Sequence, residues 1–315
     1  MSMESESVMS KNLSEKLSPS KEVAPGVVCV PILFVNVYFL VDGDDWIVVD
    51  TGLPKFAWRV REAAAQHFGK ESRPKAIVLT HGHFDHAGNA AELAQEWDVP
   101  IFVHELELPF VSGASDYPPQ DPTVGGAIAM MSRGMTNKGF DFGNRVEGLP
   151  KDGSVPGIEG WSWRHTSGHS PGHISLWHDS QKILVAGDAL ATMDLDSWSA
   201  QVTRQPKISN PPAPFTPDWA SARLSVESLA DLEPDYLVAG HGQAMQGEAL
   251  AEELSRFAKS FKAPDSGRYV GEPAKADREG LRSLPAPVDD PFSTRLLGAG
   301  VLTVVALAYF WWRRS

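Results

Sequence analysis

The string THGHFDHAGN at residues 80–89 limits the fold of this chain more than any other feature. It follows directly on the apolar run AIVLT at 76–80, which is typical of a buried strand, and leads into a predicted helix from about 87 to 97. Four potential metal ligands stand within six positions: His81, His83, Asp85 and His86. Packing gives no reason for this density, whereas imidazole nitrogen and carboxylate oxygen suit zinc, and also iron or manganese. We therefore predict a metal site at the turn from strand to helix.

The spacing within the string predicts places for two ions. Residues two apart in an extended turn project to the same side, so His81 and His83 can bind one ion together. Asp85 and His86 come after the bend and can reach a second ion.

Three further candidates stand at the ends of predicted strands, each beside a glycine that lets the backbone approach closely. They are His169 in TSGHSPGH, Asp188 in LVAGDAL and His241 in LVAGHGQ. We interpret His173 as a supporting or structural residue rather than a ligand. The remaining histidines are expected to be structural or to lie at the surface: His67, His104, His165 and His178.

The body of the chain, residues 25–262, alternates between strand and helix patterns. Short apolar strands are predicted at 27–33, 36–41, 45–49, 99–103, 161–165, 173–178, 182–186 and 236–239. Thr216, Pro217 and Asp218 form a helix start, and Leu250, Leu254, Phe257 and Phe261 mark a last amphipathic helix. Interleaving of this kind predicts a single layered α/β domain.

Charge and cysteine content exclude several classes of protein. The formal net charge of −12 argues against broad nucleic-acid binding, which needs a basic surface. Cys29 is the single cysteine, so an internal disulfide and an all-cysteine zinc site are excluded. No protein partner can be inferred.

Both ends of the chain differ from the body. Residues 1–24 are polar and predict a disordered tail, and 263–295 mix proline, glycine and charges, which predicts a flexible linker. Residues 296–312 carry no charge, span roughly 25 Å as a helix and end in aromatic residues, which predicts a single transmembrane helix. We expect a membrane protein with a C-terminal anchor and a cytoplasmic catalytic domain.

The HxHxDH string, followed in order by His169, Asp188 and His241, resembles the metallo-β-lactamase-fold hydrolases. IVVDTG, with Asp50, Thr51 and Gly52, resembles the first motif of that family. The resemblance covers roughly residues 25–262 and implies a four-layer αββα sandwich with two divalent ions at one edge of its sheets. It implies that His81, His83 and His169 bind one ion and that Asp85, His86 and His241 bind the other. Asp188 would bridge the ions, and Asp50 would support the ligands from behind.

The resemblance also implies a chemistry. Two ions a few ångströms apart activate water, and zinc is expected first, with iron or manganese as alternatives. We expect a hydrolase of ester, thioester or lactone bonds in a small-molecule substrate, similar to the branch that contains glyoxalase II and the lactonases. Asp85 is the candidate catalytic residue, relaying a proton to the leaving group. Acyl-homoserine lactonases share the HSPGH string but place a tyrosine soon after the bridging aspartate, where this chain has Leu190, Ala191 and Thr192.

Two apolar segments indicate the kind of substrate. Residues 105–160, with Phe110, Tyr117, Met130, Met131 and Met135, and residues 192–215, with Trp198, are expected to form the lips of the site. An apolar lid favours a hydrophobic or acyl substrate. A phosphodiesterase on the same fold and a membrane-tethered metal-binding protein without turnover are the alternatives.

Overall fold

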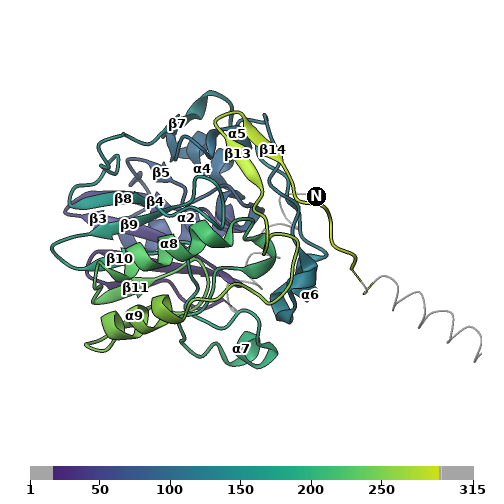
Figure 1. Cartoon of the computed structure of the whole chain (residues 1–315). Coiled ribbons are helices and arrows are strands. Elements are labelled where there is room, and N and C mark those ends of the chain that lie inside the picture. The colour runs from purple at the N-terminus through teal and green to yellow at the C-terminus, as the bar shows by residue number, and fades with distance from the viewer. Residues whose placement is uncertain (1–16, 291, 293–315) are drawn as a thin grey trace, which may run out of the picture.

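A computed structural model describes residues 17–290 and 292, which form a pair of β-sheets packed face to face between helices (Figure 1). The first sheet has seven strands in the order β1-β2-β3-β4-β5-β6-β7. They are β1 (Lys21–Ala24), β2 (Val27–Ile32), β3 (Val35–Asp42), β4 (Asp45–Val49), β5 (Ile77–Val78), β6 (Ile101–Val103) and β7 (Val146–Gly148). Strands β1 to β4 are antiparallel, whereas β4 to β7 run parallel.

The second sheet has five strands in the order β12-β11-β10-β9-β8. They are β8 (Trp161–His165), β9 (Ile174–His178), β10 (Ile183–Val185), β11 (Tyr236–Val238) and β12 (Met245–Gln246). Only the β10–β11 pair is parallel in this sheet. A separate hairpin is formed by β13 (Lys275–Asp277) and β14 (Gly280–Ser283).

The helices of the described residues fall into three sets. Those on the outer surfaces of the sheets are α2 (Ala57–Phe68), α4 (Ala90–Trp97), α8 (Trp219–Ala230) and α9 (Leu250–Ser260). Short α-helices occupy the loops: α3 (Phe84–Ala87), α5 (Leu108–Val111), α6 (Gly126–Ser132) and α7 (Trp198–Thr203). Single 3-10 turns are η1 (Pro122–Val124), η2 (Gly143–Arg145) and η3 (Ala213–Phe215).

Three apolar cores hold these layers together. Successive strand residues point to opposite faces, so in β3 Val37 and Phe39 pack toward α2 and α4, while Leu40 packs toward the second sheet. The other face of the second sheet packs on α8 and α9. Each large apolar side chain buried in this way stabilises the fold by about 1.5–3 kcal/mol. The predicted αββα sandwich is therefore present.

The transmembrane element of the predicted fold needs correction. No helix in the described stretches is long and apolar enough to cross a membrane. The longest of these helices, α2 and α8, have 12 residues each, whereas a bilayer requires about 20. The predicted span at 296–312 lies outside the described residues. We therefore correct the fold class to the sandwich alone and withdraw the membrane anchor, the membrane partner and the membrane localisation.

The predicted linker also differs from the structure. Residues 263–290 pack along the sandwich, and Tyr269 is only 3% exposed, with its hydroxyl donating to the Pro119 carbonyl at 2.6 Å. The hairpin β13–β14 lies over the loop near α5, where the Leu281 amide donates to Ser115 Oγ at 3.0 Å (Figure 1). At the other end, the first sheet already begins at Lys21, inside the predicted tail of 1–24.

Replacing Tyr269 tests whether residues 263–290 form a packed segment or a flexible linker. Tyr269→Ala is expected to lower the free energy of unfolding by about 3 kcal/mol, because it leaves a cavity in the core beside α8 and α9. Urea denaturation followed by circular dichroism measures the change. Lys275→Ala, at an exposed position of the same segment, is the control and should change stability by less than ~0.5 kcal/mol. Equal stabilities for the two variants would restore the linker interpretation.

Candidate metal centre

The candidate ligands lie at the edge of the sandwich where two parallel pairs of strands end. Asp50 follows β4, and His81 follows its parallel neighbour β5. In the other sheet Asp188 follows β10, and His241 follows its parallel neighbour β11. The carboxyl ends of parallel neighbours meet at one edge, so residues remote in sequence come together there.

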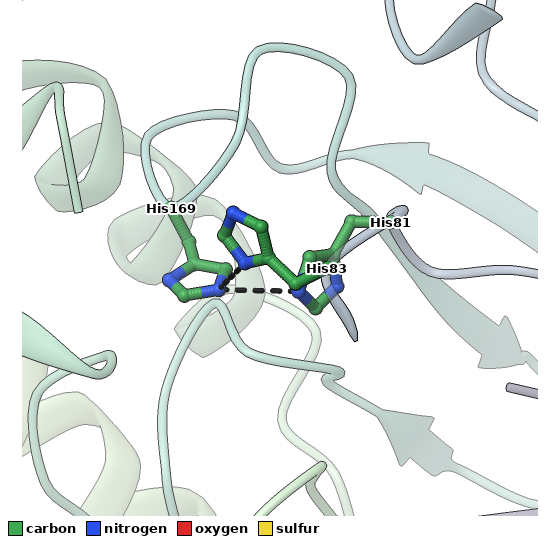
Figure 2. A group of neighbouring side chains, drawn as sticks. All are labelled: His81, His83 and His169. Atoms are coloured by element: carbon green, nitrogen blue, oxygen red, sulfur yellow. Dashed lines mark hydrogen bonds between the residues drawn. The ribbon is translucent and has the colours of Figure 1, made fainter. Parts of the chain in front are cut away.

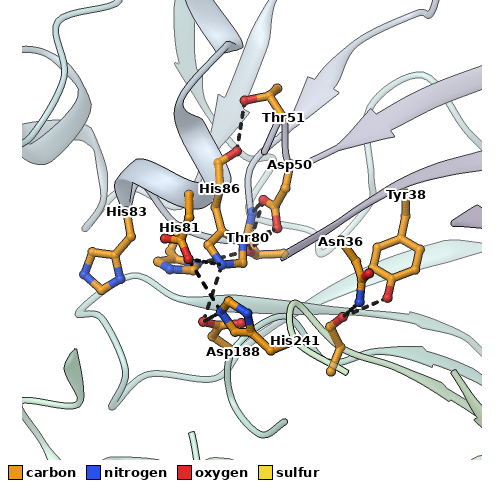
Figure 3. Close-up of polar contacts among 12 residues, drawn as sticks. Asn36, Tyr38, Asp50, Thr51, Thr80, His81, His83, His86, Asp188 and His241 are labelled. Atoms are coloured by element: carbon orange, nitrogen blue, oxygen red, sulfur yellow. Dashed lines mark hydrogen bonds and ion pairs between the residues drawn. The ribbon is translucent and has the colours of Figure 1, made fainter. Parts of the chain in front are cut away.

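The string 80–89 bends at His83, whose backbone is still extended, and then forms the single turn of α3. This turn brings Asp85 and His86 back toward His81. The bend is held from outside the string, because both the amide and the hydroxyl of Thr51 donate to the His86 carbonyl, at 2.6 and 2.9 Å (Figure 3).

A first group of three imidazoles converges on one point. His169 Nε2 lies 3.0 Å from His83 Nδ1 and 3.2 Å from His81 Nε2 (Figure 2). All three side chains are buried, and the rings meet almost at right angles. The three nitrogens are arranged as the donors of a single cation site.

A second group surrounds the Asp188 carboxylate. His241 Nε2 lies 3.1 Å from Asp188 Oδ2, and His86 Nε2 lies 3.4 Å from it (Figure 3). Asp85 Oδ2 lies 3.6 Å from His241 Nε2 and 3.9 Å from His86 Nε2. Asp188 Oδ2 is also 3.5 Å from His169 Nε2, so this carboxylate lies between the two groups.

The donor atoms fit divalent metal ions. His86 Nε2 and Asp188 Oδ1 are buried, and neither has a hydrogen-bond partner among residues 17–290 and 292. A buried polar atom without a partner costs about 1–3 kcal/mol. A cation would satisfy the lone pairs of both atoms, and neighbouring ligand-type atoms all lie within 4.8 Å of one another in each group.

Hydrogen bonds behind the ligands direct three imidazoles toward the centre. His86 Nδ1 donates to Asp50 Oδ2 at 2.8 Å, and His241 Nδ1 donates to the Phe34 carbonyl at 2.8 Å. Thr80 Oγ1 donates to Asp50 and therefore accepts from His81 Nδ1 at 3.0 Å. In each case the proton stays on Nδ1, which leaves the Nε2 lone pair free for a metal.

His173 supports Asp188 rather than entering the site, as predicted from the sequence. Its Nε2 accepts from the Asp188 amide at 2.8 Å, and its Nδ1 contacts Thr166 Oγ1 at 2.9 Å. Gly187 makes this approach possible, because a Cβ there would lie 2.6 Å from His173 Nε2 and the backbone φ is +56°. In the same way a Cβ at Gly240 would lie 2.1 Å from Asp188 Oδ1. These contacts explain the glycines directly before Asp188 and His241.

The imidazoles of the first group are in the form that binds metal. Burial, together with the neighbouring imidazoles, holds the pKa values of His81 and His169 well below the ordinary value. Burial also lowers the pKa of His83 to about 3. All three are neutral at pH 7, and a metal ion does not have to displace a proton from them.

Asp188 supplies the negative charge of the centre. Burial alone would raise its pKa, but His241 and His86 beside it hold that pKa well below the ordinary value. Burial alone would lower the pKa values of His86 and His241, but the carboxylates around them, Asp188 first among them, together raise both pKa values. The negative charge of this buried carboxylate thus stabilises a positive charge placed between these imidazoles.

All seven residues predicted from the sequence meet at this edge. Their assignment as ligands remains a prediction. Sequence reasoning missed Glu107, a fully buried carboxylate beside both ligand loops. The available signal was its place just after β6, which is the parallel neighbour of β5.

The predicted lips of the site are partly correct. An apolar cleft over the ligands includes Phe34, Ile128, Met135 and Phe215. Phe110 and Tyr117, which were expected in a lid, are instead 0% and 1% exposed and lie beneath the ligand loops. They belong to the support of the site rather than to its mouth.

Comparison with known proteins points to one family. A model of the metallo-beta-lactamase superfamily matches residues 30–241, a stretch that contains all seven candidate ligands. Probable metallo-hydrolase YflN of Bacillus subtilis (strain 168) is 40% identical over 246 residues, which are 77% of this chain and 93% of that protein. Probable metallo-hydrolase YybB of the same organism is 30% identical over 210 residues, 66% of this chain and 81% of the relative.

Solved structures share the fold. The metallo-beta-lactamase SMB-1, solved bound to 2-mercaptoethanesulfonate, matches 78% of this chain and 94% of its own with a TM-score of 0.55 at 16% identity. BJP-1 of Bradyrhizobium japonicum, a subclass B3 metallo-beta-lactamase, matches 78% of this chain and 90% of its own with a TM-score of 0.52 at 20% identity. At these identities the likeness extends to the fold alone.

The support from Asp50 can be tested by a single substitution. Asp50→Asn is expected to weaken zinc binding by the group Asp85, His86 and His241 by about 10- to 100-fold, because His86 loses the carboxylate that fixes its tautomer. Competition with a chromogenic chelator measures the affinity. Asp45→Asn, in an exposed ion pair with Lys75, is the matched control. Unchanged affinity in Asp50→Asn would contradict the role given to this carboxylate.

Proposed function

Because this chain belongs to the metallo-β-lactamase superfamily and is a metallo-hydrolase of that family, we propose that it uses two zinc ions to cleave an ester, thioester or lactone bond. The small-molecule substrate carries an apolar acyl group. The observation that supports this proposal best is the convergence of seven buried ligand-type side chains beside an apolar cleft.

The distances between their nitrogen and oxygen atoms separate the proposed ligands into two groups. His81, His83 and His169 hold one ion. Asp85, His86 and His241 hold the other. Asp188 contacts both, since its Oδ2 lies within 3.5 Å of imidazoles from each group. Zinc suits a centre dominated by imidazole, while iron and manganese remain compatible with it.

When bound, such a pair of ions lowers the pKa of water and polarises the carbonyl oxygen that is attacked. The protein orients the reacting groups through ligands that are themselves fixed by Asp50, Thr80 and the Phe34 carbonyl. Asp85 has a second role in this proposal. Its carboxylate is at the cleft, with 12% of the side chain exposed, and would take the proton that the attacking water loses and relay it to the leaving group.

The cleft favours an acyl substrate over a phosphodiester. Phe34, Ile128, Met135 and Phe215 supply apolar walls that exclude water from an acyl chain. Among the described residues that line this cleft there is no lysine or arginine, which a phosphodiester anion would require for recognition.

A substrate panel tests the proposed function directly. We expect hydrolysis of 4-nitrophenyl esters, with kcat/KM rising from acetate to hexanoate as more of the chain enters the apolar cleft. Bis(4-nitrophenyl) phosphate should be turned over at least ~100-fold more slowly, because the cleft offers no cation to its charge. Dialysis against a chelator should abolish ester hydrolysis, and zinc should restore it. A preference for the phosphodiester, or activity without metal, would contradict the proposal.

Substitution of Asp85 tests its role in proton transfer. Asp85→Asn keeps an oxygen donor but cannot carry the proton, so kcat should fall by about 10²- to 10⁴-fold. The metal content of the variant is measured in parallel, so that a loss of ions is recognised. Asp98→Asn, at an exposed helix end, is the control and should keep full turnover. Full turnover by Asp85→Asn with two ions bound would exclude the proposed role.

A further inference from the structure

Glu107 is a buried carboxylate that accepts four hydrogen bonds from residues far apart in the sequence. Its Oε2 accepts from the Gly82 amide at 3.1 Å and from the Tyr117 hydroxyl. Its Oε1 accepts from the Ser170 hydroxyl at 2.6 Å and from the Gly172 amide at 2.7 Å. The charge of this buried carboxylate is thus fully satisfied by donors from two loops and a tyrosine.

The two loops are those that carry the first group of candidate ligands. Gly82 separates His81 from His83, and Ser170 directly follows His169. One carboxylate therefore fixes the distance between the turn that presents His81 and His83 and the loop that presents His169. In Figure 2 these histidines approach one another from the two separate loops.

Tyr117 is the second residue that holds the loop of His81 and His83 in place. Its hydroxyl accepts from the Gly82 amide at 2.9 Å and donates to Glu107. Its ring meets His83 edge to face, with the centroids 4.4 Å apart, and stacks on Phe110 with the centroids also 4.4 Å apart. The His83 ring thus rests on an aromatic surface that is itself fixed by Glu107.

The glycines of the two loops give independent evidence for this close approach. A Cβ at Gly82 would lie 2.5 Å from the Tyr117 hydroxyl and 2.6 Å from Val111 Cγ1. A Cβ at Gly172 would lie 2.7 Å from the Glu107 amide nitrogen and 2.8 Å from its Cγ. No side chain fits at either position. Gly82 and Gly172 have no side chain that could bind a metal. Their close contacts with Tyr117 and Glu107 therefore explain why glycine occupies these two positions.

We propose that Glu107 and Tyr117 are positioning residues that set the spacing of His81, His83 and His169, and with it the affinity and geometry of the ion held there. This inference rests on the proposed function only in that these three histidines bind an ion. Neither residue belongs to the candidate ligand groups, and neither lines the cleft over them. Removing either should therefore change metal binding before it changes the fold.

The test compares two buried tyrosines in the full chain. Tyr117→Phe removes one hydroxyl beside the first ligand group. Tyr38→Phe removes one from an equally buried ring, whose hydroxyl donates to the Ala239 carbonyl at 2.7 Å near the other group. All variants also carry His241→Ala, which removes a ligand of the second group and leaves the first as the complete one. The metal-free proteins are titrated with zinc against a chromogenic chelator and with Co²⁺, whose absorption spectrum reports coordination geometry.

We expect Tyr117→Phe to weaken zinc binding about 10-fold and to alter the Co²⁺ spectrum, and Glu107→Gln to weaken binding by up to about 100-fold. Tyr38→Phe should keep the parent affinity and spectrum. Circular dichroism of the metal-free variants should show an intact fold. Parent-like affinity and spectrum in Tyr117→Phe would overturn the inference, and so would an equal loss in Tyr38→Phe.

Two features of this design keep the test decisive. If Glu107→Gln fails to fold, Tyr117→Phe alone decides, because it removes only one oxygen atom. Because the titrations use no substrate, their result is independent of the reaction. A wild-type chain that binds two ions but cleaves no ester would contradict the proposed function and leave this inference standing.

Discussion

A single buried carboxylate, Asp50, supports one candidate ligand from each half of the candidate metal centre, and the geometry of the site depends on its hydrogen bonds. One oxygen accepts from His86 Nδ1, and both accept from the amide or hydroxyl of Thr80, whose oxygen in turn contacts His81 Nδ1. Asp50 itself is in the left-handed conformation, at φ +60°, which costs an L-residue roughly 1–2 kcal/mol. The hydrogen bonds offset this strain, so one backbone turn after β4 orients imidazoles of both groups (Figure 3).

The αββα layering makes such a site possible. The strands that carry Asp50, His81, Asp188 and His241 are buried on both faces, so their ends cannot shift without disturbing two cores. The candidate ligands lie where the parallel pairs end, and rigid strands therefore fix their spacing. Glu107 adds a further link between two ligand loops at the end of β6.

Much of the sandwich, and the seven side chains that meet at its edge, could be predicted from the sequence, because both have local signals. Apolar strand runs, and a strand end followed by glycine and a ligand, are patterns of a few residues. The residues that support the candidate ligands from behind have no such local signal in the sequence. Tyr117 reads as an apolar lid residue, and only contacts with Gly82 and His83, distant in sequence, place it beneath the ligands. Tyr269 lies in a stretch without periodicity, and its order comes from packing and from Pro119.

The proposed dinuclear centre requires two ions held by one set of seven side chains. Anomalous scattering from crystals of the zinc-loaded protein, recorded on either side of the zinc absorption edge, tests this most directly. Two peaks are predicted, one among His81, His83 and His169 and one among Asp85, His86 and His241, with Asp188 in contact with both. A single peak, or peaks at which Asp188 contacts neither ion, would contradict the dinuclear centre.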